Sequence, residues 1–278
     1  AHGSAIISAV LRDNGGTADG GDDTSLVQSF TITITPVNDP PQGSWGGDQT
    51  VLEDAGPQTV ADWAIGILAG PPDEAGQALT FEVVGNTNPE LFAAGPVVDA
   101  VTGELTYTPA ENAHGSAVIT LILIDDGGTA DGGDDTSNEH AFTITITPVN
   151  DRPQGAWGGD QTVLEDSGPQ TVAEWAVGII AGPPDEAGQS LTFEIIGNSN
   201  PNLFAAGPTL DAATGQLSYT PAENANGLAV ITVMLVDDGG TADGGDDTSS
   251  EHAFTITVTP VNDPPSFTQG SDATVLED

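Results

Sequence analysis

The stretch HAFTITITP, residues 140–148, alternates apolar and hydroxyl side chains without a break. Its apolar members, Phe142, Ile144 and Ile146, fall on one face of an extended chain, and its threonines fall on the other. Because successive side chains of a strand point to opposite faces, this period of two predicts a β-strand with one face in a core. The pattern returns as HAFTITVTP at residues 252–260.

The surrounding sequence predicts further strands. AVITLILID at residues 117–125 is apolar almost throughout, which is typical of a central strand covered on both faces. ALTFEVVG at 78–85 and GELTYTP at 103–109 also indicate strands, separated by Asn, Gly and Pro clusters. Only TVADWAIGILAG at 59–70 could be helical, and its β-branched and small residues argue against a helix. Six or seven short strands per unit predict an all-β Greek-key sandwich.

The chain repeats itself. TPVND begins at Thr35, Thr147 and Thr259, which gives a period of 112 residues, too long for a solenoid unit and suited to a whole small domain. We therefore expect a window onto a longer tandem array. Its parts are the C-terminal fragment of an upstream repeat at 1–38, complete repeats at 39–150 and 151–262, and the N-terminal fragment of a downstream repeat at 263–278.

Differences between the two complete repeats are informative. Several are exchanges between apolar residues of similar size, which packed cores tolerate best. Trp63 and Trp175 are expected to be core aromatics, whereas Trp45 and Trp157, beside the linkers, are divided between packing and exposure. The apolar exchanges are Ile65/Val177, Leu68/Ile180, Val83/Ile195, Val84/Ile196, Leu121/Val233 and Ile124/Val236.

Charge sets limits on function. The chain has 42 acidic and two basic residues, a formal charge of −40, which excludes gripping nucleic acid or an anionic membrane surface. Such a charge is typical of a protein that is surrounded by cations, either as bound divalent ions or as salt that screens the repulsion. Without cysteine there is no disulfide or thiolate site. No apolar run approaches the about 20 residues of a membrane span, and with no signal peptide visible we expect a processed or excised chain.

Catalytic signatures are missing from the sequence. No P-loop, zinc-protease helix motif or nucleophile elbow occurs, and the many carboxylates lie in polar loops rather than in an apolar pocket. His114 is replaced by Asn226 in the second complete repeat, so no repeated machinery is expected to use it. We do not expect an enzyme.

VVDAVTGELTYTPAENAHGSAVITLILIDDGG at residues 97–128, followed by FTITITPVNDRP at 142–153, resembles the cadherin repeat. The DDGGTA loops and the PVND linkers are closer still to the cadherin-like tandem repeats of large bacterial surface proteins. The resemblance covers essentially the whole chain. It implies seven-stranded sandwiches, with calcium ions between successive repeats.

The resemblance also implies a set of calcium ligands, all of them hard oxygen donors. At the junction of the two complete repeats they are Glu53, Glu111, Asn150, Asp151, Asp185 and Asp237, with Asp238 as the alternative to Asp237. The matching positions elsewhere are Asn38, Asp39, Asp73, Asp125 or Asp126, Glu165, Glu223, Asn262 and Asp263. Pro109, Pro148 and Pro183 replace acidic ligands of the family, so fewer ions than the family's three, one or two per junction, are expected.

The acidic string DDGGTADGGDDTS at residues 125–137 recurs at 237–249 and, with one change, at 13–25. It has neither the ligand order of an EF-hand nor the nonapeptide of a calcium β-roll. We expect Asp125 or Asp126 to face the preceding linker as a ligand. The later aspartates, Asp131, Asp134 and Asp135, either hold a second ion within the loop or are solvated.

Three classes of function remain. The chain is a calcium-rigidified spacer of a bacterial cell-surface adhesin, a self-assembling extracellular filament or matrix protein, or a module that binds glycans or a partner protein. The near-identity of the repeats favours the first, because another copy adds reach without a new site. Its partners would be neighbouring repeats of the same chain, and homotypic self-association stays open. Exposed Trp45 and Trp157 would favour the third.

Overall fold

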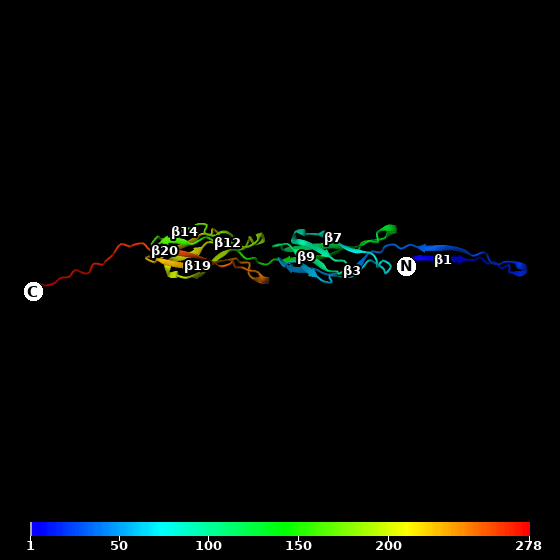
Figure 1. Ribbon diagram of the computed structural model, residues 1–278, viewed down its shortest axis with the longest axis horizontal. Helices are drawn as coiled ribbons and strands as arrows, with labels where there is room; N and C mark the ends of the chain where they lie inside the picture. Colours follow the sequence, from blue (N-terminus) through cyan, green and yellow to red (C-terminus); the bar gives the residue numbers. More distant parts are fainter. Residues whose placement is uncertain (1) are drawn as a thin grey trace. The chain divides into compact units, whose positions relative to one another are not determined.

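The computed structural model describes residues 2–278 and is built of β-strands joined by turns (Figure 1). It divides into two compact units, one reaching to Pro148 and one beginning at Val149. The all-β prediction is confirmed, and the only helical segments among residues 2–278 are single 3-10 turns such as Ala130–Gly132 and Pro184–Glu186. The boundaries of the complete repeats, 39–150 and 151–262, stay predictions.

In the first unit a hairpin precedes a sandwich. The hairpin strands are β1 (Gly3–Ala9) and β2 (Gln28–Ile34). The sandwich strands are β3 (Gln42–Trp45), β4 (Gln49–Leu52), β5 (Gln58–Val60), β6 (Ala64–Leu68), β7 (Leu79–Asn86), β8 (Phe92–Val98), β9 (Leu105–Pro109), β10 (Gly115–Asp125) and β11 (His140–Thr147).

The second unit repeats this order. Its strands are β12 (Gln154–Ala156), β13 (Gln161–Leu164), β14 (Gln170–Val172), β15 (Val177–Ile180), β16 (Thr192–Asn198), β17 (Phe204–Leu210), β18 (Leu217–Pro221), β19 (Gly227–Val236) and β20 (His252–Thr259). The long strands β10 and β19 are each the second-from-edge strand of a four-stranded sheet.

Seven strands of each unit form two main sheets. In the first unit these are the four-stranded sheet β4-β11-β10-β7 and the three-stranded sheet β5-β9-β8, and a short β3–β6 pair completes the sandwich. Strand β4 runs parallel to β11, whereas β10 is antiparallel to both of its neighbours. The second unit has the same arrangement, in β13-β20-β19-β16, β14-β18-β17 and β12–β15.

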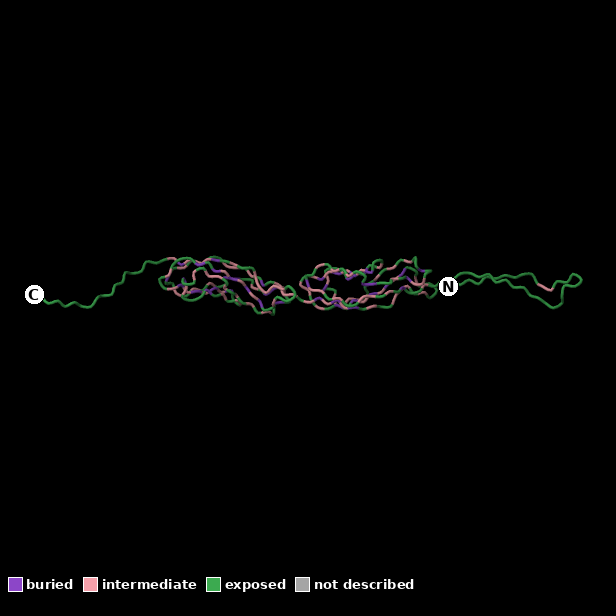
Figure 2. Tube along the Cα trace, turned by 90° about the horizontal axis from the view of Figure 1, so that it is seen from below, coloured by how far each residue is buried: buried purple, intermediate pink, exposed green. Residues whose placement is uncertain are grey.

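The core lies between the two main sheets. Leu105, Ile119 and Ile144 are fully buried in the first unit, and Trp63 and Trp175 are each 4% exposed, as predicted. The buried positions appear as the interior of each unit in Figure 2.

The two remaining tryptophans pack rather than stand exposed. Trp45 meets Phe81 edge to face with ring centroids 5.3 Å apart, and Trp157 meets Phe193 at 5.6 Å. Both tryptophans are half-buried and lie against the core clusters. Of the two alternatives left open by the sequence, packing is the correct one.

The prediction that residues 117–125 are covered on both faces is wrong. One face of β10 is buried, from Ala117 to Leu123, but Val118 is 41% exposed and Ile122 and Ile124 are only half-buried. The apolar exchanges also mark the core poorly, since Leu121/Val233 is the one pair among them that is buried in both units. Apolar residues therefore occupy one outer sheet face as well as the core.

Two segments whose structure was uncertain from the sequence are residues 59–70 and strand β8. Residues 59–70 are strand and turn, with the last two residues of β5 and all of β6 inside them, in agreement with their composition. Strand β8 was not foreseen, because its Gly95–Pro96 pair is a turn signal in the sequence, yet the strand pairs with β9 on both sides of that step.

The hairpin β1–β2 repeats the sequence of β10–β11 without its packing. Phe30 is 57% exposed where Phe142 is 3% exposed, and Ile32 is 49% exposed where Ile144 is fully buried. Pairing in the hairpin keeps the equivalent register, with Ile7 opposite Phe30. No second sheet lies over this hairpin in the described part of the chain, which is why it is exposed along its length in Figure 2.

This contrast gives a matched pair of substitutions. Ile144→Ala should lower the free energy of unfolding of the first unit by about 2–5 kcal/mol, because it leaves a cavity in a packed core. Ile32→Ala removes the same atoms from the equivalent hairpin position and should leave that free energy unchanged. Urea unfolding of both variants measures the difference; equal losses would contradict the placement of the core.

A segment of residues 39–150 should fold by itself, since β3 to β11 and the whole first core cluster lie within it. We expect a sheet-rich circular dichroism spectrum and a single cooperative melting transition in calcium. A coil-like spectrum would show that the repeat boundaries are drawn wrongly.

Candidate metal centre

Asn150, in the linker sequence PVND, ties together three loops of the second unit. Its Nδ2 donates to Asp237 Oδ1 at 3.0 Å, and its Oδ1 accepts from Gln189 Nε2 at 2.7 Å. Its backbone carbonyl accepts from the Asp246 N–H at 3.0 Å. Gly239 lets the side chain in, because a Cβ at that position would overlap Asn150 Oδ1. Two aspartates, one at the end of β19 and one in the acidic loop, are thus held beside the linker.

The first unit builds the same arrangement around Asn38. Its Nδ2 donates to Asp125 Oδ1 at 2.9 Å, and Gln77 donates to its Oδ1 at 2.7 Å. Asp126 is exposed and instead accepts from the Ala78 N–H at 2.8 Å. Of the two alternatives that the sequence left open, Asp125 is the residue that faces the linker.

A buried glutamate lies beside each linker, and sequence reasoning missed it. The Asp151 N–H donates to Glu186 Oε1 at 2.7 Å, and the Asp39 N–H donates to Glu74 Oε1 at 3.0 Å. Glu186 is 7% exposed and Glu74 is 8% exposed, whereas the predicted neighbours Asp185 and Asp73 have exposed side chains. Residue type alone does not show which of Asp185 and Glu186 is buried. The turn in which the two residues lie decides it.

Each of these clusters contains three buried oxygens that accept no hydrogen bond from the described residues. Burying a polar atom without a partner is costly, and a buried carboxylate oxygen especially so. Carboxylate and amide oxygens are the hard donors that Ca²⁺ takes in proteins. The atoms are Glu186 Oε2, Gln189 Oε1 and Asp237 Oδ2 in the second unit, and Glu74 Oε2, Gln77 Oε1 and Asp125 Oδ2 in the first.

Electrostatics in the second unit disfavours an isolated charge on Glu186. Burial raises the pKa of its carboxyl, and the negative charges of Asp151, Asp185 and Asp237 raise it further. The hydrogen bond from the Asp151 N–H works in the opposite direction. A cation at this place would offset both the cost of burying the charged carboxylate and the repulsion from its neighbours, because it supplies the missing opposite charge.

A second group of acids lies at the other end of each sandwich. Glu165 is 6% exposed; its oxygens accept from the Val261 N–H at 2.6 Å and from Asn226 Nδ2 at 3.0 Å. In the first unit Glu53 is 4% exposed, and His114 Nδ1 lies 3.6 Å from its Oε2. His114 and Asn226 occupy equivalent positions, and each lies against the buried glutamate of its unit.

The predicted ligands therefore divide between two poles of each unit. Strand β10 has 11 residues, with Asp125 at its end, while Glu53 pairs with Thr147 beside its start, so the poles are roughly 30 Å apart. One pole holds Asn38, Asp39, Asp73, Asp125 and Asp126, or Asn150, Asp151, Asp185, Asp237 and Asp238. The other holds Glu53 and Glu111, or Glu165, Glu223, Asn262 and Asp263.

Carboxylates alone do not complete a site in one unit. Within either unit taken by itself, no three carboxylate or imidazole ligand atoms of the described residues lie within 4.8 Å of one another. Gln77 and Gln189 each add a buried amide oxygen to the carboxylates of their cluster.

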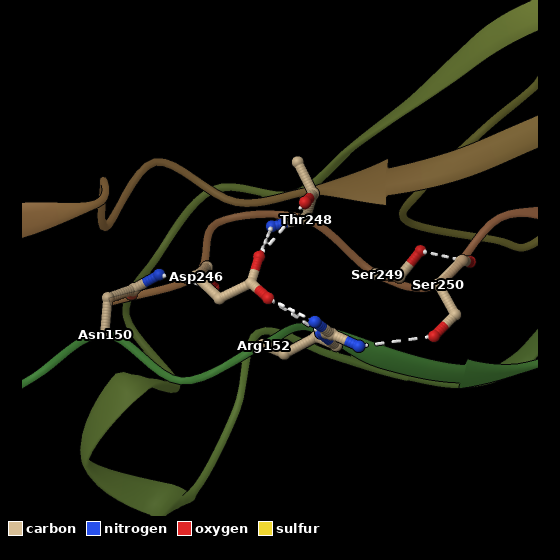
Figure 3. A network of polar contacts seen from close by, with 6 residues as sticks. All are labelled: Asn150, Arg152, Asp246, Thr248, Ser249 and Ser250. Atoms are coloured by element: carbon tan, nitrogen blue, oxygen red, sulfur yellow. Dashed lines mark hydrogen bonds and ion pairs between the residues drawn. The ribbon is translucent and has the colours of Figure 1, made fainter. Parts of the chain in front are cut away.

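The later aspartates of the acidic loop have other partners. Asp131 and Asp134 are exposed, and Asp134 Oδ1 accepts from the Thr136 N–H and hydroxyl at 3.1 Å. In the second unit the equivalent residue, Asp246, also forms an ion pair with Arg152. The Nε of Arg152 donates to Asp246 Oδ2 at 3.0 Å (Figure 3). These contacts favour the solvated alternative over a second ion within the loop.

Comparisons with known proteins are weak. No protein-family model matches the chain, and no curated protein matches it. Among solved structures, human protocadherin-24 EC1-2 has a TM-score of 0.46 at 14% identity, with 81% of this chain and 100% of that chain covered. Drosophila N-cadherin EC1-4 has a TM-score of 0.34 at 16% identity, with 92% of this chain and 58% of that chain covered.

An immunoglobulin protein resembles the chain to the same degree. The Sidekick-1 immunoglobulin domains 1-4 have a TM-score of 0.34 at 11% identity, with 92% of this chain and 72% of that chain covered. These values do not separate cadherin from immunoglobulin sandwiches. No helix among residues 2–278 has the length and apolarity to span a membrane.

The Arg152–Asp246 pair makes a titration prediction. The hydrogen bond from Arg152, together with those from Thr248, holds the pKa of Asp246 below its usual value. A lowered pKa contributes stability above the unfolded-state value that is lost as pH falls through the folded value. Arg152→Gln should raise the pKa of Asp246 and remove part of that contribution.

Carboxyl NMR of Asp246 in the wild type and in Arg152→Gln measures this shift directly. Arg12→Gln is the matched control, because Arg12 belongs to the other unit and should leave Asp246 unchanged. An unchanged titration in Arg152→Gln would show that the ion pair does not persist in solution.

Proposed function

We propose that the chain is a non-enzymatic structural repeat protein, in which each sandwich binds calcium at the pole that holds the linker asparagine. One observation carries this proposal. Three buried oxygens without hydrogen-bond donors occur at the same positions of both units, in side chains joined through the linker residues Asn150–Asp151 or Asn38–Asp39. Because the same buried oxygens lack a partner in both units, a cation bound at this position explains them better than coincidence does.

The donor set favours calcium among the common metals. It offers carboxylate and amide oxygens without thiolate, which disfavours zinc and copper. Calcium accepts six to eight oxygens in flexible geometry, whereas magnesium requires a near-ideal octahedron and keeps several waters. Carboxylates placed by three separate loops suit the more flexible ion.

The expected stabilisation is large for a small domain. Extracellular modules bind calcium with Kd of about 10⁻⁴–10⁻³ M. At a free concentration about 100 times Kd, one site stabilises the folded state by about 2.7 kcal/mol. Removing calcium would leave the buried carboxylates uncompensated, so each unit should become less stable.

The biological role that fits best is an extracellular spacer, the stalk of a bacterial surface adhesin stiffened by calcium. It is supported by the two near-identical sandwiches and by the linker and loop motifs that resemble cadherin-like repeats. The contribution of Glu53 and Glu111 to the same ions as Asn150 stays a prediction. A self-assembling filament is the second candidate, and the apolar outer face of β10 favours it. The packing of Trp45 and Trp157 removes the argument for a glycan-binding module.

Neutralising the buried glutamates tests calcium binding. The double variant Glu74→Gln, Glu186→Gln should lose the calcium-dependent rise in Tm, since each site loses a charged ligand. Its Tm in EDTA should equal or exceed that of the wild type, because a buried charge without a partner has been removed. Calorimetry in EDTA, calcium and magnesium gives the three values.

Glu82→Gln with Glu194→Gln is the matched control, since these exposed glutamates sit on the sheet away from the linker. The control should keep the full calcium response. A wild-type Tm that is the same in EDTA and calcium would refute the proposal, and the acids would then reflect life in high salt.

A further inference from the structure

The outward side of the four-stranded sheet has an unusual composition for so acidic a chain. In the first unit, β10 presents Val118, Thr120, Ile122 and Ile124 on this side, alternating with the core residues. Strand β11 beside it presents a row of threonines centred on Thr145, as expected for pairing in register. We call this surface, formed by the outward residues of β4, β11, β10 and β7, the outer face.

The second unit repeats the outer face on β13, β20, β19 and β16. Its central strand presents Val230, Thr232, Met234 and Val236, next to the threonines of β20. The positions that differ between the units, Ile122/Met234 and Ile124/Val236, remain apolar. The valine that both units share is 41% exposed as Val118 and 39% exposed as Val230. Because the same surface is built twice with different residues, its apolar character is a property of the repeat.

Charge is nearly excluded from the outer face. Among the outward positions of its four strands, the only ionisable side chain is Glu82 in the first unit and Glu194 in the second, each on the edge strand. The chain as a whole has 42 acids. Strands with apolar residues on both sides are typical of sheets that are covered on both sides. The inner side is covered by the second sheet, and no described element of the same unit covers the outer side.

We propose that the outer face docks against the outer face of a second copy of the chain. Two copies of so acidic a chain repel each other over most of their surfaces, because both surfaces carry negative charge. The outer face is the place where two copies meet with little repulsion, and its β-branched side chains can interdigitate as they do between the sheets of a sandwich. A surface that pairs with itself forms a symmetric, isologous contact.

The area of the outer face predicts a weak contact whose affinity increases with the number of repeats that take part. Four strands about 4.8 Å apart and a ladder of about seven residues at 3.4 Å each give roughly 450 Å² per unit. A stable interface buries about 800 Å² per partner, so the outer face of one unit falls short of this value. The affinity should therefore grow with the number of repeats that engage together.

Sedimentation of the full chain over a range of concentrations tests the proposal. The wild type should form dimers, more strongly at high salt, where the Debye length shrinks to about 3 Å at 1 M and repulsion is screened. Val118→Glu with Val230→Glu should weaken association by about tenfold or more, because it sets like charges against each other at the centre of the contact. Val101→Glu with Ala213→Glu adds the same charge off the face and should leave association unchanged.

Position 101 suits the control because Val101 is 93% exposed in the turn after β8 and Ala213 is its equivalent. The measurements are made in EDTA and again in calcium. The outer face contains none of the cation ligands, so dimers in EDTA would support this inference even if calcium binding failed. A wild type that stays monomeric up to about 1 mM, or a face variant that dimerises like its control, overturns the inference.

A cross-linking variant guards against misfolding of the glutamate variants. The chain has no cysteine, so Val118→Cys places a single thiol on the outer face and Val101→Cys places one off it. A short bis-maleimide should link Val118→Cys into dimers about tenfold faster than Val101→Cys, although residue 101 is the more exposed. Equal rates, or faster linking at residue 101, would count against the face.

Discussion

The shortage of positive charge is the constraint on which the rest of this structure depends. Two arginines face 42 carboxylates, so most acids must be solvated, hydrogen-bonded to the backbone or matched by a cation from outside. Arg152 serves Asp246, and backbone N–H groups serve many of the loop aspartates. Two buried oxygens, Glu186 Oε2 and Asp237 Oδ2, accept from none of these groups.

Charge and hydrophobic surface are separated along each sandwich. The acids that matter gather at the two poles, where loops and linkers can turn their oxygens inward. The sheet faces between the poles carry threonine and branched apolar residues, with Glu82 or Glu194 as the single outward acid of the four-stranded sheet. A repeat built in this way can be stiffened at its ends by cations and can contact its neighbours along its sides. The two proposals above follow from that separation and do not depend on each other.

The linker asparagine shows how little of a site is visible in residue types. PVND was recognised as a linker motif, and Asn150 was predicted to coordinate metal through a family resemblance. In the structure its side chain donates to Asp237 and Asp246 and accepts from Gln189, so it positions the oxygens of its neighbours. Metal coordination by Asn150 stays a prediction. The buried Glu186 went unnoticed because one residue separates it from Asp185, and only the turn decides which carboxylate points inward.

The sequence by itself determined the all-β class, most of the strands, the period of 112 residues and the core tryptophans. These follow from local rules, since alternation, turn residues and repetition act over a few positions. Only the tertiary structure decided which face of β10 is covered, and which of two adjacent acids is buried. Burial depends on what lies opposite in space: Phe30 and Phe142 are both followed by TITITPVND, yet only Phe142 has a second sheet over it.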